Sequence, residues 1–273
     1  MPPTRDVTLV KLGGSLLTEK ARPETARPAV IARLAAEIAA AAPRIPERLI
    51  VAHGSGSFGH VAARQHGIAG GLRSPDQLPG VSLTQDRAAA LHRQVVAALL
   101  AAGALPYSIA PSSCVVAAGG RPESLAGEPL RMALDAGLLP VLYGDVVLDR
   151  EQGVAICSTE RLFELLVRSL PALGYRVRRA LWLGETDGLY DAAGRTVPRL
   201  SAGQLGEAAR AIGQPAGTDV TGGMLHRVET ALALAAEGVP SVLLNGLTPG
   251  ALERALLREG SGAGGDPAST EIA

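Results

Sequence analysis

Cysteine and aromatic residues are scarce in this chain of 273 residues, and their scarcity excludes two kinds of structure. The two cysteines, Cys114 and Cys157, support neither a disulfide framework nor a cysteine-ligated zinc cluster. We expect both to be small apolar core residues of a protein in a reducing cytoplasm. Aromatic residues make up 3% of the chain, so the core must consist mainly of Ala, Val, Leu and Ile.

The chain also lacks a net charge and a long hydrophobic run. Lys and Arg together number 26, as do Asp and Glu, and this balance argues against a nucleic-acid partner. The longest apolar stretch, residues 88–104, is interrupted by His92, Arg93 and Gln94 and predicts an amphipathic helix, because a membrane span needs about 20 apolar residues. Since the N-terminus has no signal-peptide core, we expect a cytoplasmic protein without a membrane partner.

Short apolar runs alternate with longer segments of helical periodicity along most of the chain. With 47% hydrophobic and 19% charged residues, the composition is that of a soluble globular protein. The predicted strands are apolar on both sides, as in a mainly parallel sheet covered by helices on each face. They span residues 8–12, 48–52, 105–109, 138–143, 179–183 and 241–244, and the predicted helices span 28–42, 60–66, 84–102, 159–170, 201–212 and 223–237. The expected α/β fold is a three-layer αβα sandwich.

The chain is expected to form a single domain of two lobes over residues 1–258. Residues 119–127 and 144–153 carry turn signals and are expected to project from the end of the sheet as loops or hairpins. Residues 259–273 begin with a Gly- and Ser-rich run and predict a flexible tail.

Two glycine-rich turns, roughly forty residues apart, are the most informative feature of the sequence. The first is Lys11-Leu12-Gly13-Gly14-Ser15, the second is His53-Gly54-Ser55-Gly56-Ser57-Phe58-Gly59-His60, and each follows an apolar run typical of a strand. A strand that ends in glycines before a helix exposes backbone N–H groups that suit phosphate oxygens. With Lys11, Lys20 and His60 beside them, the turns predict two phosphates held face to face, as a small-molecule kinase requires.

Lys11 and His60 each have a structural alternative. Lys11 either binds a phosphate or is a lysine at a strand end whose ammonium reaches solvent. His60 is expected to open the helix over 60–66 and to donate a ring N–H to a phosphate, whereas a lone histidine more often caps a helix or faces solvent. Three further histidines show no metal-ligand spacing and are interpreted as structural: His66, His92 and His226.

Other nucleotide-binding patterns fit less well. The longer phosphate loop that ends in Gly-Lys-Ser/Thr does not occur in the chain. Gly54-x-Gly56-x-x-Gly59 has the spacing of a dinucleotide fingerprint, but no Asp or Glu ends a following strand about twenty residues further on. A dehydrogenase is therefore disfavoured.

A third glycine turn precedes the predicted helix over 223–237. Asp219 or Thr221 can cap that helix, and the Gly222-Gly223 pair allows close approach of an anion. Arg227 would project from the first turn of the helix. A plain tight turn would use the same glycines.

Together these segments resemble the amino acid kinase superfamily. The resemblance rests on Lys11-Leu12-Gly13-Gly14-Ser15, Gly144-Asp145, Thr186-Asp187-Gly188 and Thr221-Gly222-Gly223-Met224, in this order, and it extends from about residue 8 to residue 256. Within the superfamily, Thr18 and Lys20 after the first turn and His60 at the end of the second are similar to the isopentenyl phosphate kinases. Relatives that phosphorylate amino acids lack that histidine.

The resemblance implies ATP-dependent phosphorylation of isopentenyl phosphate to isopentenyl diphosphate, with Mg²⁺ carried by ATP and no metal site of the protein's own. It implies a homodimer, an acceptor site in the N-terminal lobe and a nucleotide site in the C-terminal lobe. Its catalytic residues would be Lys11, Lys20 and His60. The nucleotide would be bound by Lys11, Gly13, Gly14, Ser15, Gly56, Glu185, Gly223 and Arg227. The acceptor would be bound by Ser55, Gly56, Gly59, His60 and Thr159.

The chain departs from the family pattern at three places. Arg227 stands where relatives usually have Lys, which keeps the charge but changes its geometry. Ser55 stands where they usually have Gly, and Ser158-Thr159-Glu160 stands where they commonly have Ser-Gly-Asp. Glu160 is therefore the candidate for the carboxylate that holds the active-site lysines.

Two other functions fit the same turns: a phosphonate kinase acting on a molecule such as fosfomycin, and a nucleotide-binding protein without turnover. The presence of Lys11, Lys20 and His60 argues against the protein without turnover. The acceptor pocket separates the two kinases, because a five-carbon tail needs an apolar cavity and fosfomycin a small polar one. We expect the tail pocket between the second turn and the helix near residue 84. Its expected lining is Ile68, Leu72, Leu78 and Leu83, with Val95 or Leu99.

Overall fold

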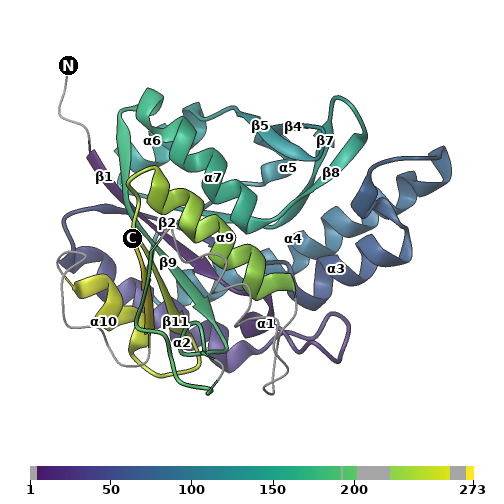
Figure 1. Cartoon of the computed structure of the whole chain (residues 1–273). Helices are drawn as coiled ribbons and strands as arrows, with labels where there is room; N and C mark the ends of the chain where they lie inside the picture. The colour runs from purple at the N-terminus through teal and green to yellow at the C-terminus, as the bar shows by residue number, and fades with distance from the viewer. Residues whose placement is uncertain (1–4, 192, 202–221, 259–268) are drawn as a thin grey trace.

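The computed structural model describes residues 5–191, 193–201, 222–258 and 269–273. In this part of the chain, one large sheet has the strand order β10-β12-β11-β9-β1-β2-β6-β3 (Figure 1). Its strands are β1 (Arg5–Leu12), β2 (Arg48–His53), β3 (Pro106–Ser108), β6 (Leu139–Tyr143), β9 (Tyr175–Gly184), β10 (Arg199–Leu200), β11 (Ser241–Asn245) and β12 (Ser269–Ile272). All neighbouring pairs are parallel except β11 with β12, so the predicted mainly parallel sheet is confirmed.

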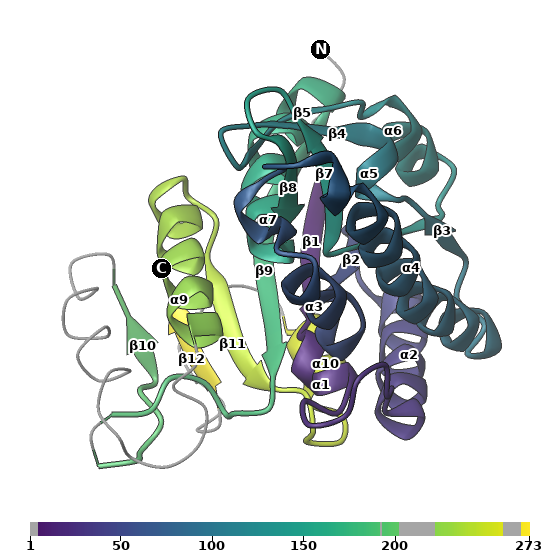
Figure 2. The same cartoon turned by 90° about the vertical axis from the view of Figure 1, so that its right-hand side faces the viewer.

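Helices cover both faces of this sheet, as Figures 1 and 2 show. One face carries α6 (Glu128–Asp135), α7 (Thr159–Ser169) and α9 (Gly222–Ala236), and the other carries α2 (Pro28–Ala41), α4 (Leu78–Ala101) and α10 (Ala251–Leu257). Successive side chains of β1 alternate between the two faces, so that Leu9 packs with α7 and Val10 with α2. This alternation explains why the strands are apolar on both sides and confirms the three-layer sandwich.

The segments expected as projecting hairpins form a second, four-stranded sheet. One hairpin pairs β4 (Val115–Ala118), which follows the short α5 (Pro111–Cys114), with β5 (Arg121–Leu125), and the other pairs β7 (Asp145–Asp149) with β8 (Gly153–Cys157). Of the two forms expected for these segments, loops or hairpins, the structure shows hairpins; their union through the parallel pair β4 and β7 was not predicted. That pairing joins segments about thirty residues apart, which local turn signals do not reveal.

The prediction of a flexible tail over residues 259–273 is wrong for its last residues. Residues 269–272 form β12, which lies between β10 and β11 in the large sheet. Thr270 is fully buried, and its hydroxyl donates to the Val197 carbonyl at 2.7 Å. Pairing with the distant β11 overrides the loop-like composition just upstream. Residues 259–268, most of the predicted helix over 201–212, and Asp219 and Thr221 lie outside the described residues.

Two helices begin earlier than predicted. The second glycine turn runs directly into α3 (Gly56–Gln65), so α3 begins four residues before His60. α4 begins at Leu78, after a turn in which Ser74 and Gln77 form a reciprocal capping box. Among the described residues, no helix has both the length and the apolar character needed to cross a membrane.

Candidate active site

The carboxyl ends of β9, β1, β2 and β6 meet in one row of the large sheet. The residues that pair across this row are Leu183, Leu12, His53 and Tyr143. Beyond the row, the N–H groups of Gly13, Gly54 and Gly144 donate to the carbonyls of Leu183, Leu12 and His53, at 2.9, 3.0 and 2.8 Å respectively. The sheet thus continues for one more step before the chain turns, and the turns lie side by side.

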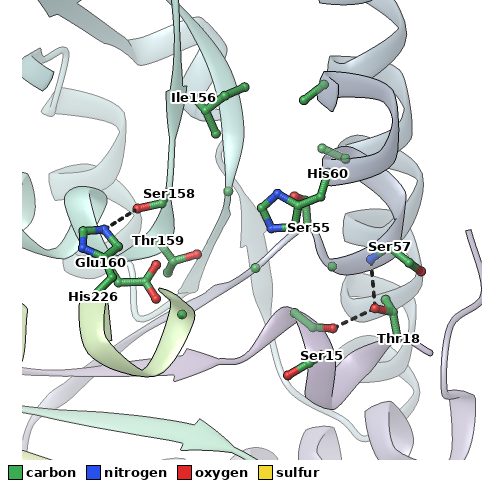
Figure 3. Close-up of a pocket in the computed structure, with 18 of the residues that line it drawn as sticks. Ser15, Thr18, Ser55, Ser57, His60, Ile156, Ser158, Thr159, Glu160 and His226 are labelled. Carbon is green, nitrogen blue, oxygen red and sulfur yellow. Dashed lines mark hydrogen bonds between the residues drawn. The ribbon is translucent and has the colours of Figure 1, made fainter. Parts of the chain in front are cut away.

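The two glycine-rich turns predicted to face each other are in direct contact. A Cβ atom on Gly14 would lie 2.6 Å from the Gly56 nitrogen, and one on Gly54 would lie 2.8 Å from the Gly14 nitrogen. Thr18, at the end of α1 (Gly14–Leu17), ties the turns together: its hydroxyl donates to the Gly14 carbonyl at 2.9 Å and accepts from the Ser57 N–H at 3.0 Å (Figure 3). The glycines are therefore required by the contact of the turns as well as by any phosphate.

A cavity of about 730 Å³ opens over these turns. It is lined by every residue predicted for the site except Gly13: Lys11, Gly14, Ser15, Lys20, Ser55, Gly56, Gly59, His60, Thr159, Glu185, Gly223 and Arg227. Gly13 instead packs against β9, where a Cβ atom would lie 2.8 Å from the Leu183 carbonyl oxygen. The structure thus brings together residues from both ends of the chain.

Lys11 projects from β1 into the cavity and forms a buried ion pair with Glu160 in the first turn of α7. Burial opposes ionisation of Glu160, but the Lys11 ammonium outweighs it and lowers the pKa of Glu160 to about 2. Burial lowers the pKa of Lys11, and Glu160 counteracts this effect. The predicted contact of Glu160 is confirmed for Lys11, whereas the Lys20 ammonium lies 3.6 Å from Glu185.

His60 lies in the second turn of α3 with its imidazole beside Ser55 and directed toward the cavity (Figure 3). Desolvation in the cavity wall lowers the pKa of His60, and the positive charges of Arg64 and Lys11 lower it further against the effect of Glu160. The imidazole is therefore neutral near pH 7, and one of its ring nitrogens carries a proton to donate.

Two further cationic residues, Lys20 and Arg227, line the cavity. Glu185, just after β9, accepts a hydrogen bond from Arg27 at 2.8 Å and lies near Lys20. Gly223 and Arg227 lie in the first turns of α9, and the Arg227 guanidinium packs so closely on Gly184 that a Cβ atom there would lie 2.5 Å from it. Lys11, Lys20 and Arg227 thus line the same cavity as the two glycine-rich turns.

Sequence analysis missed several residues of the cavity wall. His226, interpreted as structural, lines the cavity and lies 3.5 Å from the Ser158 hydroxyl (Figure 3). Asp145 is buried there and accepts from the N–H groups of Ser112 and Val146, and burial raises its pKa. Each residue had one signal in the sequence. His226 directly precedes Arg227, and Asp145 belongs to one of the motifs that carry the family resemblance.

The residues predicted for the tail pocket differ from those that line the cavity between the second turn and α4. The apolar part of the cavity, here called the tail region, is lined by Ala63, Ala69, Thr84, Ala88 and Ile156. None of the six predicted residues lines the cavity: Ile68, Leu72, Leu78, Leu83, Val95 and Leu99. Val95 and Leu99 follow Thr84 and Ala88 on one stripe of α4, but a helix rises about 1.5 Å per residue and carries them into the core beside α2.

The sequence and the fold are similar to those of known proteins. The model of the amino acid kinase family matches residues 6–245, and the chain belongs to that family. The isopentenyl phosphate kinase of Methanothermobacter thermautotrophicus is 34% identical over 266 residues, which are 92% of this chain and 95% of that protein. The isopentenyl phosphate kinase of Haloferax volcanii is 34% identical over 255 residues, 91% of this chain and 98% of that protein.

Solved structures agree with this assignment. An isopentenyl phosphate kinase determined by X-ray methods has a TM-score of 0.76 to this structure at 30% identity, covering 93% of this chain and 97% of that one. The product complex of T. acidophilum isopentenyl phosphate kinase has a TM-score of 0.66 at 24% identity and covers 92% and 94% of the two chains, which shows the same fold.

Proposed function

We propose that this protein transfers the terminal phosphoryl group of ATP to isopentenyl phosphate, giving ADP and isopentenyl diphosphate. The observation that carries the proposal is the contact of the two glycine turns in one cavity, with the buried Lys11 beside them and an apolar region beyond His60. Similarity to isopentenyl phosphate kinases over more than nine-tenths of the chain supports the choice of acceptor.

Charge explains how such a site would work. Donor and acceptor are both anionic, so catalysis requires positioning and neutralisation more than covalent chemistry. Lys11, held by Glu160, would neutralise the phosphoryl group as it moves from donor to acceptor. The attacking group is already an anionic phosphate oxygen and needs no general base, so the neutral His60 would act as a hydrogen-bond donor.

The acceptor phosphate has a favourable position beside Gly144. Gly144, Ser55 and Thr159 all line the cavity. A Cβ atom on Gly144 would make only ordinary contact with the Ser55 nitrogen at 3.6 Å and with the Cys157 carbonyl oxygen and the Thr159 hydroxyl at 3.7 Å, so these groups border the same space beside Gly144. The Thr159 hydroxyl is buried and has no hydrogen-bond partner in the described part of the chain. A buried hydroxyl without a partner is unfavourable, and a phosphate oxygen in this space would satisfy it together with the Ser55 N–H.

ATP would occupy the side of the cavity that carries Ser15, Glu185, Gly223 and Arg227. Among the described residues, no group of three or more His, Cys, Asp or Glu side chains is arranged to hold a metal ion. Mg²⁺ bound through ATP phosphates and its own waters needs no such group, so these residues fit a metal that enters with the nucleotide. The ion would neutralise phosphate charge. The expected homodimer and cytoplasmic location stay predictions.

The tail region favours a prenyl phosphate over fosfomycin. Its side chains, Ala63, Ala69, Ala88 and Ile156, are apolar, and Thr84 adds a methyl group beside its hydroxyl. Each buried methylene of a five-carbon tail contributes about 0.8 kcal/mol, whereas the small polar fosfomycin would gain little from this wall.

A coupled ADP-release assay tests the proposal with four acceptors: isopentenyl phosphate, dimethylallyl phosphate, geranyl phosphate and fosfomycin. We expect the highest kcat/KM with isopentenyl phosphate, and we expect this kcat/KM to be strongly lowered in His60→Ala. His66→Ala is the matched control, because His66 ends the same helix outside the cavity. A higher kcat/KM with fosfomycin than with isopentenyl phosphate would identify fosfomycin as the better acceptor and overturn the proposed substrate. ATP binding without ADP release for any acceptor would support a protein without turnover.

A further inference from the structure

A chain of hydrogen bonds runs from the exposed Ser108 through two buried histidines to the second glycine turn, and none of these three side chains lines the cavity. It joins Ser108 at the end of β3, His92 on α4 and His53 at the end of β2. His92 Nε2 lies 2.7 Å from the Ser108 hydroxyl, and His92 Nδ1 lies 3.0 Å from His53 Nε2. His53 Nδ1 lies 3.1 Å from the Gly54 carbonyl oxygen. Both rings stack with Tyr143, at centroid distances of 4.3 and 5.8 Å, so packing also holds them.

The chemistry of these groups gives the chain one direction. A carbonyl oxygen only accepts, so His53 Nδ1 must carry the proton. Burial lowers the pKa of His53 to about 4 and that of His92 to about 3, so each neutral ring has one N–H. His53 Nε2 therefore accepts from His92 Nδ1–H, and His92 Nε2 accepts from the Ser108 hydroxyl. Every donor points toward the glycine turn.

The end of this chain controls a peptide group of the candidate phosphate site. In a trans peptide, the carbonyl of Gly54 and the N–H of Ser55 point in opposite directions. His53 is not a cavity residue, so its hydrogen bond draws the Gly54 carbonyl away from the cavity. Ser55, in contrast, lines the cavity together with Gly144, and its nitrogen would lie 3.6 Å from a Cβ atom on Gly144.

We propose that His53 and His92 are positioning residues, whose hydrogen-bonded chain from Ser108 orients the Gly54–Ser55 peptide so that the Ser55 N–H faces the acceptor phosphate. Without this series of hydrogen bonds, the Gly54 carbonyl is free to rotate and to present an oxygen lone pair to the anion. The inference rests on the proposed function for the identity of the acceptor. It assigns a role to two histidines that touch neither substrate.

Steady-state kinetics of His92→Leu test the role. Removing the His92 donor should raise KM for isopentenyl phosphate about tenfold, while KM for ATP changes less than twofold, because only the acceptor meets the Ser55 N–H. His92→Asn should recover most of the loss, since its amide nitrogen can replace Nδ1 as the donor to His53. Val95→Ala is the packing control: it shortens a buried side chain about one turn further along α4 and should leave both KM values unchanged.

A second measurement is independent of turnover and of the identity of the acceptor. In ¹H–¹⁵N spectra, inorganic phosphate should shift the Ser55 amide resonance of the wild type and of His92→Asn, and much less that of His92→Leu. If His92→Leu does not fold, Ser108→Ala takes its place, because Ser108 is exposed. In that variant the phosphate-induced shift of the Ser55 amide resonance should also be smaller than in the wild type. A wild type inactive with isopentenyl phosphate would overturn the proposed function alone. An unchanged acceptor KM and Ser55 response in folded His92→Leu, or an equal change in Val95→Ala, would overturn the positioning role.

Discussion

Gly144→Ala should block the acceptor phosphate while leaving the fold intact. The added methyl group would lie 3.6 Å from the Ser55 nitrogen and 3.7 Å from both the Cys157 carbonyl oxygen and the Thr159 hydroxyl, which are ordinary van der Waals distances. Gly144 is not among the glycines with positive φ, so alanine can adopt its backbone conformation. Replacing such a glycine stabilises a protein by about 0.4–1 kcal/mol, because the unfolded chain loses freedom.

The same methyl group would project into the space proposed for a phosphate oxygen and exclude the oxygen from it. Excluding that oxygen removes hydrogen bonds to a charged group, each of which contributes about 1.5–3 kcal/mol. Loss of a single such bond corresponds to about 10- to 150-fold, so we expect Gly144→Ala to lower kcat/KM for isopentenyl phosphate by at least that factor, with KM for ATP unchanged and the melting temperature equal or higher. Gly70→Ala, at an exposed glycine that does not line the cavity, is the control. A wild-type KM for isopentenyl phosphate in folded Gly144→Ala would refute this position of the phosphate.

Three further predictions concern charged and titratable groups. His60→Ala should lower kcat/KM by about 10- to 150-fold with the unfolding free energy within about 0.5 kcal/mol of the wild type, and near-native kinetics would contradict its donor role. Lys11→Ala should lower kcat by at least about 10²-fold, while calorimetry still detects ATP binding. Because the substitution leaves Glu160 without its partner, the free energy of unfolding should also fall by about 3–5 kcal/mol, and adding Glu160→Gln should restore part of that loss. A loss of ATP affinity in proportion to the lost rate would make Lys11 a binding residue only. Finally, His53 and His92 take up protons below pH 6.5 in the unfolded chain but stay neutral while buried in the folded protein. Denaturant unfolding should therefore show that stability falls from pH 6.5 toward pH 4, by up to about 1.4 kcal/mol per pH unit for each histidine. His92→Asn should reduce this slope, and an equal slope in the variant would contradict burial of His92 in its neutral form.

The position of the candidate site was predictable because its signals are local. Glycines after apolar runs end parallel strands at one edge of a sheet, and this edge is where Gly14, Ser15, Ser55 and Gly56 meet. Glu160 was also found from sequence, by its place in a segment that departs from the family pattern. Its ion pair with Lys11 confirms that choice.

The tail pocket and the histidine chain were not predictable in the same way. Thr84, Ala88, Val95 and Leu99 share one apolar stripe of α4, and helical periodicity cannot tell which part of a long helix borders a cavity and which part packs on α2. His92 lies on the same helix and was interpreted as structural because it has no metal-ligand spacing. Its partners in β2 and β3 are set by the strand order.

The sequence by itself determined the strand–turn–helix units, the chemistry of the turns and the family, since all of these depend on neighbouring residues. Only the tertiary structure decided which units meet. Lys11 and Glu160 are 149 residues apart, and β12 follows a Gly- and Ser-rich stretch yet lies within the large sheet. The physical reason is that burial and strand pairing act between segments distant in the chain, so they override local composition and select the contacts that form the cavity.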